Sequence, residues 1–289
     1  MVQARRLGYA VLATPDLDRQ VDYYCDVLGL VLVTRDASHA VLATRQGVET
    51  LVLKAGAAPE LLGLAFQVSP KTDLDEACAA VRAKGLEATV RGGQTPGIAR
   101  VLAFSDPKGT EIELFADFAF AQTPPGEHGI SPLKLGHVAY FVTDVMAITR
   151  FYEDVLGFRR SDWRGEGSMF MRCGTDHHTV NFFRRDKAEL AHLAFEVKDW
   201  PELARASDYL WRRKIILDWG PARHHIGHNM ACYHRNPDNV RIELYTEMDQ
   251  MKDEELGFFD PRPWHEDRPQ RPKDWPAGTT RNQWIPNVP

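Results

Sequence analysis

The chain repeats itself in five blocks that keep their order. The second copy follows the first at an offset of 128 residues in the opening blocks, as for residue 135 against residue 7, and the offset drifts only to 130 in the last block. The paired blocks are LGYAV (7–11) with LGHVA (135–139), PDL (15–17) with TDV (143–145), YCDVLG (24–29) with YEDVLG (152–157), GLAFQV (63–68) with HLAFEV (192–197), and DPKGTEIELF (106–115) with NPDNVRIELY (236–245). Such order and spacing predict two homologous domains.

Each copy divides further into two βαβββ units. In the second copy we expect a strand at 135–142, a helix at 144–156 that Asp144 caps and Gly157 ends, and short strands at 168–173 and 179–184. The second unit is expected to hold a strand at 190–197, a helix near 199–214 and strands at 230–235 and 240–246. The predicted fold class is α+β, with each domain a curled mixed-sheet half-barrel.

The expected boundaries follow composition. A first domain spans 1–122, a linker around Gly126 contains Pro124 and Pro125, and a second domain spans 130–250. Residues 251–289 are rich in proline and tryptophan, which is too apolar for a disordered linker. We expect this extension to lie as a strap on the second domain.

Charge and cysteine usage narrow the class of protein. The 289 residues carry a formal charge of -5, which leaves no basic field for a nucleic acid. We find no apolar run of the ~18 residues that a membrane span needs, and no signal peptide. The four cysteines form no CxxC pair, which is typical of reduced thiols. We therefore expect a cytoplasmic protein that acts on a small molecule and binds neither membrane nor nucleic acid.

The two copies differ where chemistry is expected. His137 and His192 of the second copy stand where the first copy has Tyr9 and Gly63, whereas Glu243 matches Glu113 of the first copy. Two imidazoles and one carboxylate form the facial ligand set of non-haem Fe(II) oxygenases and leave coordination positions open. The sequence therefore predicts a metal site in the second domain and none in the first.

With these motifs in hand, the chain resembles the vicinal-oxygen-chelate superfamily and, within it, the two-domain type I extradiol catechol dioxygenases. The resemblance spans about residues 5–247, and its clearest segments are LGHVAYFV (135–142), HHTVNFF (177–183), HLAFEV (192–197), GPARHH (220–225) and YHRNPDNVRIELYTE (233–247). It implies Fe(II), or alternatively Mn(II), on the histidine and glutamate trio. It also implies a catechol and O2 as substrates, a muconic semialdehyde-type product of aromatic catabolism, and a homo-oligomer.

The resemblance also assigns roles to residues around the metal. His178 is the expected acid–base group, although its neighbour His177 is an alternative, and His224 and Tyr233 are expected to orient the substrate oxygens. From the sequence itself, Arg223, Phe182 and His228 are further candidates for lining the substrate site, although Arg223 could instead pair with an acidic residue and Phe182 could belong to the core. The turn NPDN (236–239) departs from the family's usual Asp-Pro-x-Gly, and Asn239 is expected to accept the left-handed conformation there.

Three other functions compete with this one. A metal-dependent isomerase or lyase of the same superfamily would use similar ligands but usually needs a fourth. A ring-cleaving enzyme for hydroquinones or aminophenols would share the metal site and differ in substrate. A binding protein without catalysis would need no ligand trio.

Overall fold

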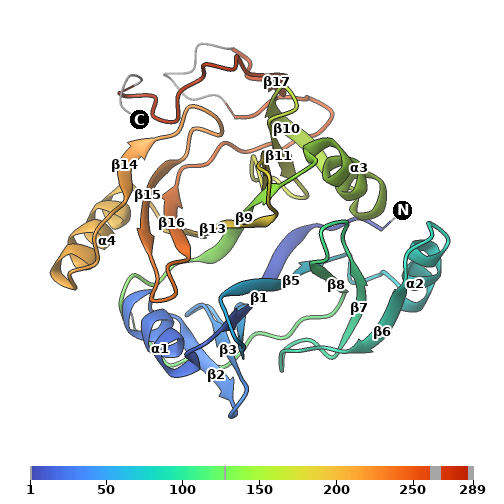
Figure 1. Cartoon of the computed structure of the whole chain (residues 1–289), viewed down its shortest axis with the longest axis horizontal. Coiled ribbons are helices and arrows are strands. Elements are labelled where there is room, and N and C mark those ends of the chain that lie inside the picture. The colour runs from blue at the N-terminus through green and yellow to red at the C-terminus, as the bar shows by residue number, and fades with distance from the viewer. Residues whose placement is uncertain (1, 127, 261–267, 286–289) are drawn as a thin grey trace.

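Two curled mixed sheets form the molecule, one from each copy of the repeat (Figure 1). The structure is a computed structural model that describes residues 2–126, 128–260 and 268–285. The first sheet has the strand order β2-β3-β4-β1-β5-β8-β7-β6, and the second has β14-β15-β16-β13-β9-β12-β11-β10-β17. Neither sheet closes into a barrel, so each leaves a concave face. The predicted α+β fold with two half-barrels is confirmed.

The first copy follows the predicted βαβββ order twice. Its elements are β1 (Arg6–Thr14), α1 (Leu17–Asp22), a π-helical turn η1 (Tyr23–Val27), β2 (Val31–Arg35), β3 (His39–Ala43), β4 (Glu49–Ala55), β5 (Glu60–Gln67), α2 (Leu74–Arg82), β6 (Ala88–Gly92), β7 (Arg100–Ser105) and β8 (Glu111–Phe115).

The second copy has the same order. Its elements are β9 (Lys134–Val142), α3 (Val145–Leu156), β10 (Arg159–Arg164), β11 (Ser168–Arg172), β12 (Val180–Arg184), β13 (Glu189–Glu196), α4 (Trp200–Arg212), β14 (Trp219–Arg223), β15 (Met230–Arg235) and β16 (Arg241–Thr246). The expected helix ends are confirmed: Asp144 accepts a hydrogen bond from the Ala147 backbone N–H, and Gly157 ends α3 with a φ of 70°. Asn239 also takes the left-handed conformation, with a φ of 62°.

The two central strands of each sheet come from its two units and run antiparallel. In the second sheet these are β9 and β13, flanked by β12 parallel to β9 and by β16 parallel to β13. The last strand of each unit therefore lies beside the first strand of the same unit. This arrangement places β9, β13 and β16 next to one another at the floor of the concave face.

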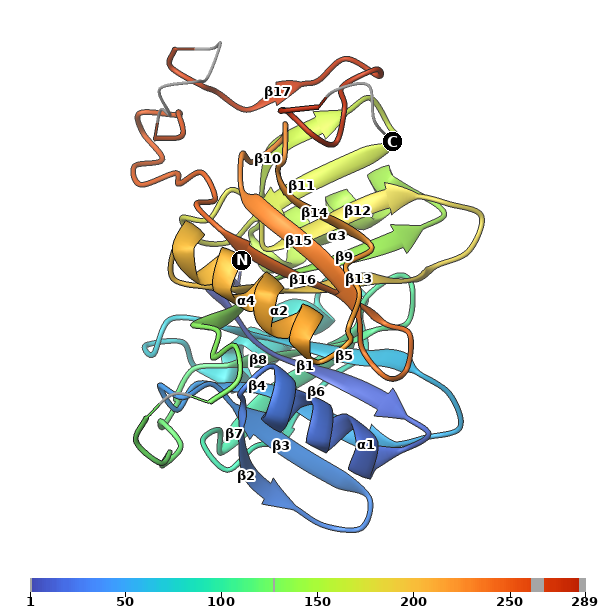
Figure 2. The ribbon, with the colours of Figure 1, turned by 90° about the vertical axis from the view of Figure 1, so that its left-hand side faces the viewer.

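The two copies pack against each other (Figure 2). They share a hydrophobic core and buried polar contacts. The Tyr23 hydroxyl lies 2.6 Å from Nε2 of His234, and the Asn236 amide donates to Gln20 Oε1 at 3.1 Å. Both contacts link α1 and η1 to the β15–β16 hairpin.

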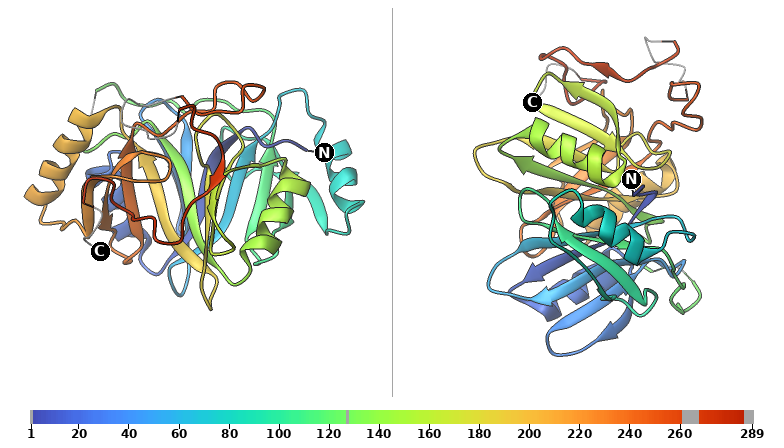
Figure 3. Two further views of the ribbon diagram at one scale, coloured as in Figure 1. Left: turned by 90° about the horizontal axis from the view of Figure 1, so that it is seen from above. Right: turned by 90° about the vertical axis from the view of Figure 1, so that its right-hand side faces the viewer.

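The C-terminal extension lies along the second sheet, seen in red in Figure 3. Its strand β17 (Lys273–Asp274) pairs in parallel with β10, and Phe259 is fully buried against His177. Within the described residues, no helix is long and apolar enough to cross a bilayer.

Candidate metal centre

Strand register explains why the three predicted ligands meet. Ala194 on β13 is the direct partner of His137 on β9 and of Glu243 on β16. The small alanine side chain thus leaves a gap between two side chains that stand on the same face. His192 lies two residues before Ala194 and so projects from that same face of β13.

The donor atoms of the three residues fit one divalent ion. Glu243 Oε2 lies 3.1 Å from Nε2 of His137 and 3.1 Å from Nε2 of His192, and the two nitrogens are 3.3 Å apart. These distances match the ~3 Å edge of an octahedron with metal bonds of ~2.1 Å. If both imidazoles donated to the Glu243 oxygen, two N–H groups would be held against each other at 3.3 Å, whereas one metal ion can accept the lone pairs of all three atoms. Two nitrogens and one carboxylate oxygen suit Fe(II) or Mn(II).

The protonation states suit coordination as well. Burial would raise the pKa of the Glu243 carboxyl, but His137 and His192 outweigh burial and hold that pKa well below its usual value. Burial lowers the pKa of His192 to about 4, although Glu243 opposes this shift. At neutral pH the site therefore offers a carboxylate and a neutral imidazole, the forms that bind metal.

The first copy has lost this site. There the Tyr9 hydroxyl donates to Glu113, and the Arg91 guanidinium donates to the same carboxylate at 2.6 Å. A phenol and a fixed positive charge thus occupy the neighbourhood of the retained glutamate. Within the described part of the chain, the only group of metal-binding side chains found is His137, His192 and Glu243.

Tyr233 and His224 flank the ligand Glu243 on one side. Tyr233 on β15 is the cross-strand partner of Glu243, which explains their ten-residue spacing, and its hydroxyl donates to Glu243 Oε2 at 2.6 Å. His224 Nε2 lies 2.9 Å from the same hydroxyl, and Trp219 stacks on the His224 ring at 4.7 Å. Burial lowers the pKa of His224 to about 4, so this imidazole is neutral and able to accept a proton.

His178 lies on the other side, with its ring 4.4 Å from that of His137. Its Nδ1 is 2.9 Å from Nδ1 of His177, and His177 Nε2 is 2.9 Å from the buried carboxylate of Asp162. Because the carboxylate accepts from His177 Nε2, His177 Nδ1 is left to accept from His178 Nδ1. The lone pair of His178 Nε2 is then free. His178 lines the cavity, whereas His177 lies behind it.

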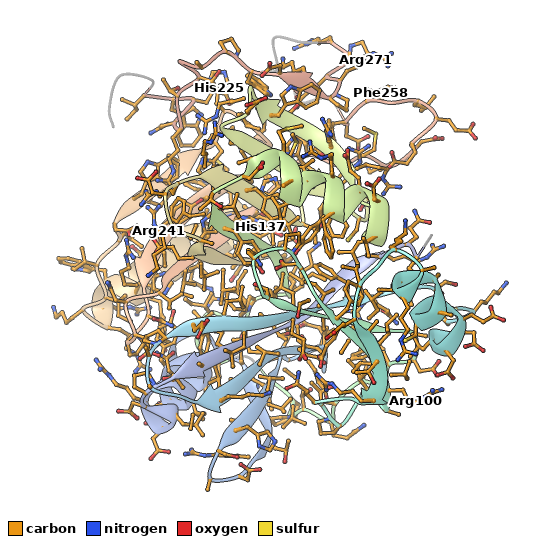
Figure 4. The ribbon with its side chains drawn as sticks, turned by 45° about the vertical axis from the view of Figure 1, so that its right-hand side comes forward. Arg100, His137, His225, Arg241, Phe258 and Arg271 are labelled. Carbon is orange, nitrogen blue, oxygen red and sulfur yellow. The ribbon has the colours of Figure 1, made fainter. Side chains whose placement is uncertain are left out.

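A cavity of about 610 Å³ opens in front of these groups, a size that suits a small aromatic molecule. His137, His192 and Glu243 lie at one end of it, with His178, His224 and Tyr233 beside them. Figure 4 shows His137 within the second half of the molecule and Arg241, another lining residue, at its side.

Three residues expected at the substrate site lie elsewhere. Phe182 is fully buried against Tyr140 and Tyr152, because alternation along β12 turns its neighbours Asn181 and Phe183 to the cavity instead. Arg223 forms an ion pair with Glu247 at 2.7 Å. His228 Nδ1 pairs with Asp249 at 2.7 Å. Neither Arg223 nor His228 lines the cavity.

Sequence reasoning also missed contributors to the site. Asn229 donates to Glu243 Oε1 at 2.9 Å, and Asp162 supports His177 from β10. Arg281 of the extension lines the cavity next to Tyr233. Asn229 adjoins the histidine cluster at 224–228 and could have been noticed there. Asp162 and Arg281 carry no local signal, because their partners are distant in sequence.

Comparison with known proteins identifies the family. A model of the Glyoxalase/Bleomycin resistance protein/Dioxygenase superfamily matches residues 6–114 and 134–244. The iron-dependent extradiol dioxygenase of Rhodococcus jostii is 26 % identical over 86 % of this chain and 91 % of its own. The manganese-dependent 2,3-dihydroxybiphenyl 1,2-dioxygenase of Geobacillus genomosp. 3 is 24 % identical over 83 % and 84 %.

Solved structures agree with these relatives. Homoprotocatechuate 2,3-dioxygenase of Brevibacterium fuscum, in complex with 3,4-dihydroxyphenylacetate, superimposes with a TM-score of 0.82 at 25 % identity, over 99 % of this chain and 90 % of its own.

The chain therefore belongs to the glyoxalase/bleomycin resistance/dioxygenase superfamily. Within that superfamily it is an extradiol ring-cleaving dioxygenase, and its histidine and glutamate trio provides the donor set for a divalent metal, as relatives named for iron and for manganese suggest. The predicted family and enzyme class are confirmed.

Proposed function

We propose that this chain cleaves the ring of a catechol beside its two hydroxyl groups, with His137, His192 and Glu243 holding the metal and the first domain serving as support. The observation that carries this proposal is the single face formed by the three donor atoms, which lie 3.1–3.3 Å apart at one end of an aromatic-lined cavity. The bound metal supplies a place where two catechol oxygens and O2 are held together.

The protein's own groups handle the protons. His224 and Tyr233 lie on the side of Glu243 where a catechol oxygen would stand, and they hydrogen-bond to each other at 2.9 Å. They can orient that oxygen through hydrogen bonds. His178 stands across the site with a free Nε2, so it could take up a proton from the substrate side of the cavity and later donate it back there.

The test compares substrates whose two hydroxyl groups are ortho, as in catechols, with hydroquinone, whose hydroxyl groups are para. We expect metal-loaded protein to consume O2 with catechols and to form a yellow ring-fission product, and to leave hydroquinone untouched, because para oxygens cannot chelate one metal. Oxygen uptake with hydroquinone or aminophenol but not with catechols would replace this substrate assignment. His178→Ala should keep its metal and turn over more slowly, and loss of metal in that variant would contradict the role given to His178.

A further inference from the structure

The cavity in front of the metal centre is lined by an excess of arginine in a chain whose net charge is -5. Its charged lining residues are Arg164, Arg185, Arg235, Arg241, Arg281, Glu189 and Glu243. Glu243 is committed to the metal. Arg235 and Arg241 share Asp218, at 3.0 and 2.9 Å.

The other three arginines, Arg164, Arg185 and Arg281, have no carboxylate partner among the described residues. Arg185 lies over the Phe141 ring at 3.7 Å, and its guanidinium makes no hydrogen bond within that part of the chain. Arg164 donates to Ser168 Oγ at 3.1 Å and to the Thr279 carbonyl at 3.5 Å. These contacts orient the guanidinium groups but leave their charge uncompensated.

Arg281 comes from the extension and stands closest to the reaction centre. Its guanidinium lies 4.5 Å from the centre of the Tyr233 ring and 4.8 Å from that of Trp219. Its backbone carbonyl is 3.1 Å from Nδ1 of His224, and nearby the Gln283 N–H donates to the Arg223 carbonyl at 2.8 Å. The main chain thus fixes Arg281 over the β14–β15 side of the cavity.

The three arginines line the same cavity from different parts of the second domain and the extension. Arg164 belongs to β10 and Arg185 follows β12, on the arm of the sheet opposite to β14 and β15. Phe141, Phe170 and Phe183 line the cavity on that arm. An aromatic ring would contact these phenylalanines, while an anionic group attached to it would come within reach of guanidinium groups from both arms.

We propose that the ring substituent of the substrate ends in a carboxylate, and that Arg281 and Arg185, supported by Arg164, bind it. This inference rests on the proposed catechol cleavage. A carboxylate matches the planar fork of a guanidinium, and a pocket with several unpaired positive charges raises the local concentration of anions. A neutral alkyl substituent would leave the three charges without a partner.

The experiment compares substrates matched in the number of substituent carbons. Three acids, 3,4-dihydroxybenzoate, 3,4-dihydroxyphenylacetate and 3-(3,4-dihydroxyphenyl)propanoate, are set against 4-methyl-, 4-ethyl- and 4-propylcatechol. We expect at least one acid to have a kcat/KM about 10-fold above that of its neutral counterpart, the order of effect for a partly exposed charged hydrogen bond. This preference should shrink as ionic strength rises.

Variants locate the effect. Arg281→Gln and Arg185→Gln should each raise the KM for the preferred acid about 10-fold, a larger change than either variant causes in the KM for the matched neutral catechol. Arg271→Gln is the matched control, because Arg271 belongs to the same extension and lies well apart from His137 in Figure 4. Among the described residues it bonds to the Leu256 and Gly257 carbonyls. Arg185 is exposed and lies outside the extension. Arg185→Gln therefore still tests binding of the acid if Arg281→Gln disturbs the packing of the extension.

Binding to metal-free protein gives a second readout. Calorimetric titration with 3,4-dihydroxyphenylacetate and with 4-ethylcatechol should show tighter binding of the acid, lost in Arg281→Gln. Equal use of acids and neutral catechols, or equal effects of the variants on both series, would overturn the anion site and leave catechol cleavage standing. Cleavage of none of the six catechols at full metal occupancy would overturn the proposed function, while the titration would still decide the anion site.

Discussion

At the residue scale, His178 depends on two residues that never reach the cavity. The order of hydrogen bonds from Asp162 through His177 to His178 leaves Nε2 of His178 unprotonated toward the substrate. Asp162 also accepts from the Lys273 N–H of the extension at 3.0 Å, so this chain of contacts is tied to β17. Asp162 and His177 are therefore positioning residues for the acid–base group.

Asp162→Asn should lower kcat about 10- to 100-fold while metal content and melting temperature stay near wild type. The amide can donate to His177 Nε2, which reverses the protonation of both imidazoles and places a proton on His178 Nε2. Steady-state kinetics with metal analysis measures this. Asp274→Asn is the control, because Asp274 of the extension accepts from the Gly165 N–H in the turn after β10, and no contact with His177 is found among the described residues. Wild-type kcat in Asp162→Asn would contradict the role assigned to Asp162.

The expectations from sequence that the structure did not bear out at this scale have two causes. Phe182 and Phe183 differ by one position on β12, and a one-residue uncertainty in strand register exchanges core for cavity. Arg223 and His228 were placed by their nearness to His224, but their acid partners Glu247 and Asp249 come from beyond β16. The metal ligands were predictable because the repeat supplied an internal comparison at each of those positions.

At the element scale, the opening strand of each copy needs a glycine beneath an aromatic residue of the closing strand. A Cβ on Gly136 would lie 1.7 Å from the Tyr245 hydroxyl oxygen, and a Cβ on Gly8 would lie 2.5 Å from the Phe115 ring. Tyr245 packs in turn on the ring of His137 at 5.1 Å. The same packing rule thus serves stability in one copy and ligand placement in the other.

Gly136→Ala and Gly8→Ala should each destabilise the protein by roughly 1–3 kcal/mol, since a buried ring must move in both. Only Gly136→Ala should weaken metal binding, because only Tyr245 supports a ligand. Denaturant unfolding and metal titration on both variants measure the two effects. Equal metal affinity in the two variants would show that Tyr245 does not position His137.

Most elements were predictable from sequence, and the extension was not. Asp144, Gly157 and the apolar periodicity define α3 locally, which is why its ends matched. The course of residues 268–285 depends instead on contacts with β10, β14 and His224, which no local pattern encodes. Residues 261–267 and 286–289 lie outside the described structure, so the predicted strap over 251–289 is met only in part.

At the scale of the whole molecule, the two copies divide the work. The second binds metal, and the first covers it through a buried interface in which the neutral imidazole of His234 accepts from the Tyr23 hydroxyl. Burial lowers the pKa of His234 to about 4, against ~6.5 in an unfolded chain. Between these values the unfolded chain takes up the proton more readily, so this contribution to stability is full above pH 6.5 and is lost as pH falls toward 4.

Lowering the pH from 7.5 to 5 should therefore reduce the free energy of unfolding of the wild type by about 2 kcal/mol more than it reduces that of His234→Phe, because phenylalanine does not titrate. Denaturant unfolding of both proteins at the two pH values gives the difference directly. His178, His192 and His224 also titrate on acidification, but they are common to both proteins and cancel. If the difference in unfolding free energy between the two proteins were the same at both pH values, His234 would be protonated or solvated in the folded state.

The central claim is that one metal, held by His137, His192 and Glu243, serves extradiol cleavage of a catechol. The most direct test is the oxygen consumed per catechol by protein loaded anaerobically with Fe(II), measured together with metal content. The account predicts one metal per chain, one O2 per catechol and a yellow ring-opened product, all lost in Glu243→Ala. Full metal occupancy with no oxygen uptake, or uptake that yields hydrogen peroxide and a quinone, would contradict it.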